Sequence, residues 1–200
     1  MTATPSGPFQ ITDFLRELCA DMAQRVSQLS HIDVARIGFS FSQTRSRSQY
    51  GTWASITPLR FEGGAETVVR RGRRMRIERI VGRTGVEYIY IFRAYLPRLW
   101  DLPFEEKLQT IVHELLHISP EFNGDIRRFG GRCYAHGANQ KHFDACAAAL
   151  GQRWRHLGAP ETLLTPLRLS FGELCLKYRS IVGMKIGRPR IVPVTDEPKE

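Results

Sequence analysis

The sequence predicts an α+β fold from the order of its hydrophobic patterns. A helical pattern over residues 9–29 is followed by about four strand-like segments between residues 31 and 94, and then by further helical patterns. Strands grouped in this way, with helices before and after them, are typical of α+β domains. We therefore expect a small, mostly antiparallel sheet that packs against an N-terminal helix and a later helix between Asp101 and Pro120.

The elements before residue 95 follow from local patterns. The first helix is expected from about Phe9 to Leu29, because its apolar residues recur every three or four positions. Residues 31–41 alternate in two phases, which predicts a bulge near Ala35 and Arg36. The strand over residues 51–61 contains Pro58, which places it at an edge or ends it. A hairpin turn at residues 82–85 leads to residues 86–94, which are apolar on both faces as in a central strand.

The most specific motif follows these strands and reads His113-Glu114-Leu115-Leu116-His117. Side chains four residues apart lie on one face of a helix, so both imidazoles can bind one metal ion, and zinc is the usual metal for such a pair. Glu114 lies where a carboxylate can act as general base on a metal-bound water. The apolar residues between 104 and 118 fall on the opposite side, with Asp101 as N-cap and Pro120 as the stop.

A catalytic zinc ion usually has three protein ligands and one open position for water. We expect the third ligand between residues 120 and 150. The leading candidate is His136, because Gly137 gives its backbone freedom, and His142 is the alternative. The remaining candidates are carboxylates, namely Glu121, Asp125 and Asp144. The metzincin spacing is excluded, because Asn123 stands at its third histidine position.

Composition limits the class of protein. The chain has 200 residues, of which 42% are hydrophobic and 24% charged, as in a globular domain. We expect a disordered lead over residues 1–8, one domain over 9–158, a packed extension over 159–187 and a flexible tail over 188–200. The start of the chain lacks the pattern of a secretory signal, and no apolar run is long enough for a membrane span, so a cytoplasmic protein is expected. The four cysteines form no C-x-x-C pair, which argues against a zinc ribbon.

Residues 31–150 resemble the phage and bacterial metallopeptidases related to SprT-like proteins. The similarity rests on the His-Glu-x-x-His motif, on the sequence from Ile118 to Phe129 and on the later pair His136-Gly137. The resemblance implies a zincin-like fold, a third zinc histidine at His136 and a base at Glu114. The chain departs from this family at its C-terminal part, where many SprT-like proteins have a cysteine zinc ribbon and this one has only Cys175.

These observations predict a zinc metalloendopeptidase acting on a protein or peptide substrate. In this hypothesis zinc binds His113, His117 and His136, and Glu114 is the general base. Candidates to stabilise the oxyanion are Tyr134, Arg127 and Arg128.

The alternative hypothesis is a basic, nucleic-acid-associated binding protein with a structural zinc and no hydrolase activity. The net charge is +9, and seven arginines lie between Arg70 and Arg83. Such a patch favours DNA, RNA or another polyanion as a partner. The oligomeric state is left open by the sequence.

Overall fold

The computed structural model describes residues 7–44, 51–129 and 140–194. Strand β1 (Phe9–Gln10) leads into helix α1 (Ile11–Arg25), which ends before a 3₁₀ turn at Ser27–Leu29. The first helix is therefore shorter than expected at both ends. Its predicted first residue belongs to β1, because Phe9 pairs in parallel with Ile181 of strand β9 (Ile181–Val182).

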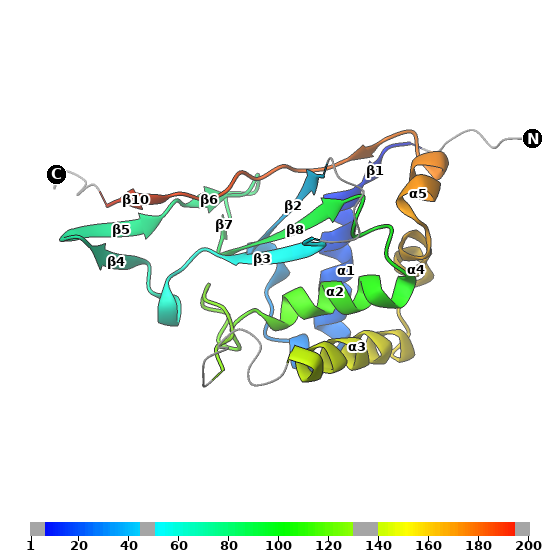
Figure 1. Cartoon of the computed structure of the whole chain (residues 1–200), viewed down its shortest axis with the longest axis horizontal. Coiled ribbons are helices and arrows are strands. Elements are labelled where there is room, and N and C mark those ends of the chain that lie inside the picture. Colours follow the sequence, from blue (N-terminus) through cyan, green and yellow to red (C-terminus); the bar gives the residue numbers. More distant parts are fainter. Residues whose placement is uncertain (1–6, 45–50, 130–139, 195–200) are drawn as a thin grey trace, which may run out of the picture.

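The main sheet has three strands in the order β2-β8-β3 (Figure 1). They are β2 (Ile37–Gln43), β8 (Tyr90–Leu96) and β3 (Ala54–Pro58). The predicted central strand is confirmed in β8, and Pro58 ends the edge strand β3. The predicted bulge is wrong: residues Val34–Arg36 form a 3₁₀ turn, in which the Asp33 side chain accepts a hydrogen bond from the Ala35 amide at 3.0 Å.

Parallel pairing is a second difference from the expectation. β2 pairs in parallel with β8, and β1 in parallel with β9, whereas β3 is antiparallel to β8. The hairpin predicted at residues 82–85 is confirmed, since β6 (Ile80–Val81) pairs antiparallel with β7 (Glu87–Tyr88). The fold is a mixed α and β arrangement in which antiparallel pairings remain the more frequent.

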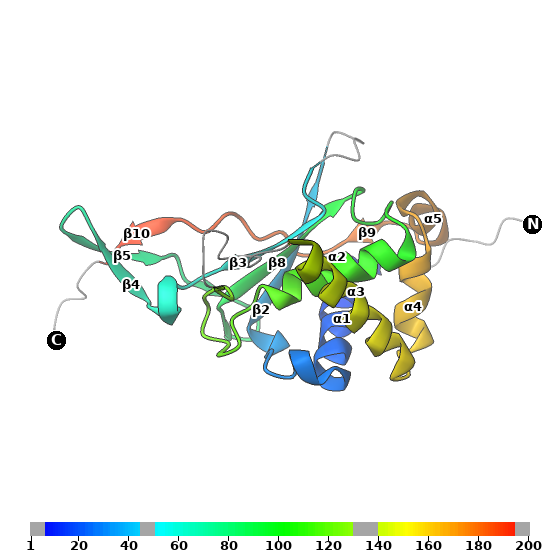
Figure 2. The ribbon, with the colours of Figure 1, turned by 60° about the horizontal axis from the view of Figure 1, so that its bottom comes forward.

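A second sheet extends away from the helices (Figures 1 and 2). Its strand order is β10-β5-β4, and both pairings are antiparallel. The strands are β4 (Thr67–Arg70), β5 (Arg73–Ile77) and β10 (Ile191–Pro193). We call residues 67–77 together with β10 the arm. Residues 191–193 thus form a paired strand where the sequence predicted a flexible tail.

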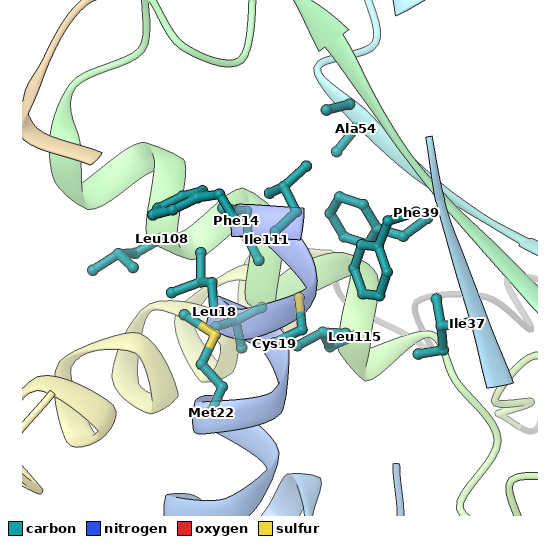
Figure 3. Packing of buried hydrophobic residues seen from close by; sticks show 14 of the residues in the cluster. Phe14, Leu18, Cys19, Met22, Ile37, Phe39, Ala54, Leu108, Ile111 and Leu115 are labelled. Atoms are coloured by element: carbon teal, nitrogen blue, oxygen red, sulfur yellow. The ribbon is translucent and has the colours of Figure 1, made fainter. Parts of the chain in front are cut away.

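The helices lie on one side of the main sheet. Helix α2 (Phe104–Leu116) packs on β3, and α3 (Gln140–His156) lies against α2 on the side away from the sheet (Figure 1). Side chains from α1, α2 and the sheet share one core, shown in Figure 3. The N-cap of α2 is Pro103 rather than Asp101, whose carboxylate instead accepts a hydrogen bond from the Phe171 amide at 3.0 Å.

The predicted extension over residues 159–187 contains two further helices, α4 (Glu161–Arg168) and α5 (Phe171–Lys177). A capping box between Ser170 and Glu173 starts α5. Beyond β9 the chain crosses the other face of the sheet, where the Ile186 amide donates to the Ser40 hydroxyl at 2.9 Å. None of the helices in the described part of the chain combines the length and apolar character that a bilayer span requires.

Candidate functional site

Helix α2 presents its motif as the spacing predicted. Leu108, Ile111 and Leu115 are buried in the core, whereas His113 and His117 are only partly buried. The two histidines therefore lie on the side of α2 that faces away from the core and toward α3. The amphipathic pattern of this helix sets that orientation, because the apolar stripe can only be buried with the histidines outward.

The two imidazoles converge on one point. The Nε2 atom of His117 lies 3.0 Å from the Nε2 atom of His113, and the ring centroids are 4.8 Å apart. Two nitrogen ligands of a tetrahedral zinc ion, each about 2.0–2.1 Å from the metal, would be about 3.3 Å apart. The pair therefore fits one zinc ion after an opening of a few tenths of an ångström.

Helix α3 supplies two residues that fix these rings. The Nδ1 atom of His113 lies 2.8 Å from a carboxylate oxygen of Asp144, and the Phe143 ring stacks on His117 with centroids 5.0 Å apart. A carboxylate at Nδ1 keeps the proton there and leaves the Nε2 lone pair for a metal. The sequence had offered Asp144 as a metal ligand; the structure places it against a histidine instead.

Glu114 reaches from α2 to the edge of the main sheet. One of its carboxylate oxygens, Oε2, accepts a hydrogen bond from the Ile56 amide of β3 at 2.8 Å. Burial raises the pKa of Glu114 to about 7, although the hydrogen bond from Ile56 partly offsets this effect. The motif therefore joins the histidine face of the helix to the edge strand.

A cleft of about 480 Å³ opens over the motif. It lies between the residues that precede and begin β3 on one side and the two helices α2 and α3 on the other. Its lining residues are Gly51, Thr52, Trp53, Ala54, Gln109, Thr110, His113, Glu114, His117, Gln140 and Asp144. All three motif side chains thus share one solvent-connected space with the start of an edge strand.

The loop that follows α2 has a structural role. Asp125 is 4% exposed, and its carboxylate accepts hydrogen bonds from the Gly63 and Ile126 amides and from Arg128. Burial acts to raise the pKa of Asp125, but these hydrogen bonds outweigh it and the pKa is lowered. Tyr90 completes the arrangement by donating its hydroxyl to the Asp125 carbonyl at 2.7 Å.

This loop also holds the end of the motif. The amide and side chain of Arg127 donate to the carbonyl oxygens of His117 and Leu116 at 2.6 and 2.9 Å. Glu121 accepts a hydrogen bond from the Ser119 hydroxyl, which lowers the pKa of Glu121. The loop residues that the sequence offered as ligands or oxyanion donors are therefore engaged in fixing the loop and the helix end.

The third ligand is not supplied by the residues considered so far. His142 lies exposed on α3, with its Nε2 atom 3.6 Å from the Cys146 sulfur. Within the described ranges, no group of three histidine, cysteine, aspartate or glutamate side chains is arranged to hold a metal ion. His136 and Tyr134 lie outside the described residues, so the third ligand stays a prediction from the sequence.

Neither a protein-family model, nor a curated protein, nor a solved structure matches this chain. The relation to SprT-like metallopeptidases therefore remains a prediction from the motif.

Proposed function

We propose that this chain is a zinc-dependent endopeptidase, with the metal held by His113, His117 and His136. The observation that supports the proposal is the convergence of the two Nε2 atoms, 3.0 Å apart, beside a carboxylate on Nδ1 of one ring. A zinc ion would bind the two converging Nε2 atoms, and a carboxylate at Nδ1 is the usual partner of a zinc-bound histidine.

Each cleft residue has a role in this proposal. Zinc bound here supplies a Lewis acid that polarises a carbonyl and makes a bound water acidic. The Glu114 carboxylate accepts the proton of the attacking water and returns it to the leaving amine. Its Oε2 atom is fixed by the Ile56 amide at 2.8 Å, which leaves Oε1 for the proton. The Asp144 carboxylate accepts a hydrogen bond from Nδ1 of His113 and so keeps the imidazole proton on that nitrogen. The Nε2 atom of the ring is then available to the metal.

The substrate class follows from the wall of the cleft. Residues Gly51 to Ala54 run along it in the chain leading into β3, an edge strand of the sheet. An extended peptide can bind such an edge through main-chain hydrogen bonds. We therefore propose a protein substrate cut within an exposed, extended segment.

The direct test uses the variant Glu114→Gln beside Glu106→Gln, which changes an exposed carboxylate on the same helix. Zinc content is measured by elemental analysis, and hydrolysis by the release of peptides from an unfolded protein such as casein. We expect Glu114→Gln to keep its zinc and lose at least about 100-fold in hydrolysis, because general base catalysis supplies about that much. Equal hydrolysis in both variants would remove Glu114 from the reaction.

The third ligand is tested by the pair His136→Ala and His142→Ala. We expect zinc content to fall sharply in the first variant and to stay unchanged in the second, since His142 is exposed and lies beside Cys146. If His136→Ala keeps its zinc and His142→Ala loses it, His142 is the third ligand. No zinc in the wild-type protein after zinc is supplied would contradict the metallopeptidase proposal.

A further inference from the structure

The arm concentrates positive charge far from the cleft. Residues 67–77 contain five arginines and no acidic residue, and they form the β4–β5 hairpin that projects away from the helices (Figures 1 and 2). Among the described residues, the third strand, β10, pairs with Met75 to Ile77, and after it the Val194 amide donates to the Arg74 carbonyl at 2.9 Å. Within the described residues, the outer part of the arm, from Arg70 to Arg73, is therefore a two-stranded ribbon.

Ion pairing divides the arm into a base and an outer part. At the base, Arg60 lies 3.0 Å from Glu87, and Arg79 lies 3.5 Å from Glu66. Further out the arginines form no ion pair with a carboxylate of the described residues. These are Arg70, Arg71, Arg73, Arg74 and Arg76. Arg70 lies over the Phe61 ring, 5.8 Å from its centroid, so its charge is not neutralised. Within the described part of the chain, this cationic surface has no anionic partner and is available to an external polyanion.

The register of the hairpin places like charges against each other. Arg70 and Arg73 are directly opposite across the two strands, a pairing that destabilises a hairpin. The turn between them is Arg71-Gly72, with φ values of 49° and 73°. A left-handed conformation costs energy for an arginine. The tip therefore has two destabilising features, the repulsion between Arg70 and Arg73 and the left-handed backbone of Arg71. Binding of an anion would offset the first of them.

Both faces of the ribbon are charged. Alternate side chains of a strand point to opposite faces, so Arg73 shares one face with Arg70, and Arg74 and Arg76 share the other. A hollow of about 610 Å³ is lined by Arg70, Arg71, Arg73 and Met75. Arg74 and Arg76 line a second hollow of about 190 Å³. A partner that surrounds the ribbon with anions on two sides would satisfy both faces.

We propose that the arm binds double-stranded DNA by inserting its two-stranded tip into the major groove, where the arginines of the two faces contact the phosphates of the two backbones. The B-DNA major groove is about 12 Å wide and admits a two-stranded ribbon. The major groove of an RNA duplex is too narrow for side chains to read. Residues 67–77 contain no aromatic side chain on which unpaired bases could stack, so single strands are the poorer fit. The binding is independent of sequence, because the contacts are to phosphates.

The test measures the anisotropy of labelled 20-base-pair duplexes of two unrelated sequences, titrated with the whole chain at several salt concentrations. Each phosphate neutralised contributes about −0.9 to the slope of log affinity against log salt. The four arginines on the two faces of the ribbon, Arg70, Arg73, Arg74 and Arg76, therefore predict a slope of about −3.6. We expect the double variant Arg70→Gln/Arg73→Gln to have a slope of about −1.8 and at least tenfold weaker binding at about 100 mM salt. The matched control is Arg153→Gln/Arg179→Gln, which removes two exposed arginines outside the arm.

Four outcomes would overturn the proposal. These are no duplex binding at about 50 mM salt, equal weakening in the control variant, tighter binding of a single strand of the same length, and arm-dependent binding of phosphatidylserine vesicles that matches the duplex. A circular-dichroism melting curve shows that each variant is folded. The Glu114→Gln protein should bind the duplex as the wild type does, so failure here is separate from failure of the peptidase proposal.

Discussion

The cleft and the arm differ in how their polar side chains are paired and buried. In the cleft, His113, Glu114 and Asp144 each have a partner within 3.0 Å and are at least partly buried. On the arm, exposed arginines face one another and the solvent. Groups that are held in place before a ligand arrives suit chemistry at one point, whereas exposed cations on a projecting ribbon suit a long, uniformly charged partner. The two regions are therefore expected to fail independently when mutated.

The largest effect should come from removing a histidine of the pair. We expect His117→Ala to lose its zinc and to reduce hydrolysis by about 1000-fold or more, because the metal provides both a Lewis acid and an activated water. Binding of duplex DNA should stay within twofold of the wild type. Loss of DNA binding in this variant, measured by anisotropy, with a native melting curve would contradict the independence of the cleft and the arm.

A cation in the body offers a contrast with those on the arm. Lys107 is 1% exposed, and its Nζ atom donates to the carbonyl oxygens of Leu167 and Leu169 at 3.0 and 2.5 Å. Burial lowers the pKa of Lys107 from 10.5 to about 8, an effect partly opposed by Asp101 and Glu173. Between these two values the unfolded chain binds more protons than the folded one, so the free energy of unfolding rises with pH.

We therefore expect the wild type to gain about 2–3 kcal/mol of stability over Lys107→Met between pH 7 and pH 10. Urea unfolding at a series of pH values measures this difference. The control Lys185→Met changes an exposed lysine and should follow the wild type. Parallel curves for the wild type and Lys107→Met would show that the buried amine titrates normally.

Asp144 should matter less than the histidines, because it acts through His113. We expect Asp144→Asn to weaken zinc binding by about 10- to 100-fold without abolishing it. Competition with a chromophoric chelator gives the affinity, and Asp13→Asn, an exposed carboxylate on α1, is the control. An unchanged affinity in Asp144→Asn would mean that its contact at 2.8 Å does not orient the ring.

The smallest effect concerns the arm alone. Replacing Arg73 by threonine removes the like-charge pair with Arg70 and adds a residue with high β propensity, so we expect a gain of about 0.5 kcal/mol in the free energy of unfolding. The charge part of the gain should shrink in about 1 M salt, where screening is strong. Loss of stability at low salt would indicate that Arg73 has a folding role and would weaken the contrast between the two regions.

Local signals in the sequence were sufficient to predict the helix that carries the His-Glu-x-x-His motif and the direction in which its histidines point. The spacing of His113 and His117 against the apolar stripe predicted a helix with both rings on one face, and α2 has this orientation. The hairpin at 82–85 and the central position of β8 were equally local, because turn residues and an apolar run define them. These features depend on residues within one or two turns of each other.

Long-range contacts could not be predicted in the same way. The parallel pairing of β2 with β8 joins residues about fifty positions apart, and Asp144 meets His113 only because α3 packs on α2. Helices α4 and α5 were missed since each is short and α4 contains Pro166, which argues against a helix. The fold class and the motif were thus accessible from sequence, whereas the partners of each motif residue were not.

The strands at residues 181–193 have a consequence for biosynthesis. The Met184 amide donates a hydrogen bond to the Thr12 hydroxyl, 172 positions earlier in the chain. Strand β9 pairs with β1, and β10 pairs with β5. At about 5–20 residues per second, the ribosome needs roughly 10–35 s to synthesise the chain between these partners. During that interval the edge of β1, and for a shorter time the edge of β5, is exposed on the nascent chain, where it can pair with other strands. This protein should therefore depend on chaperones during translation more than its size would suggest.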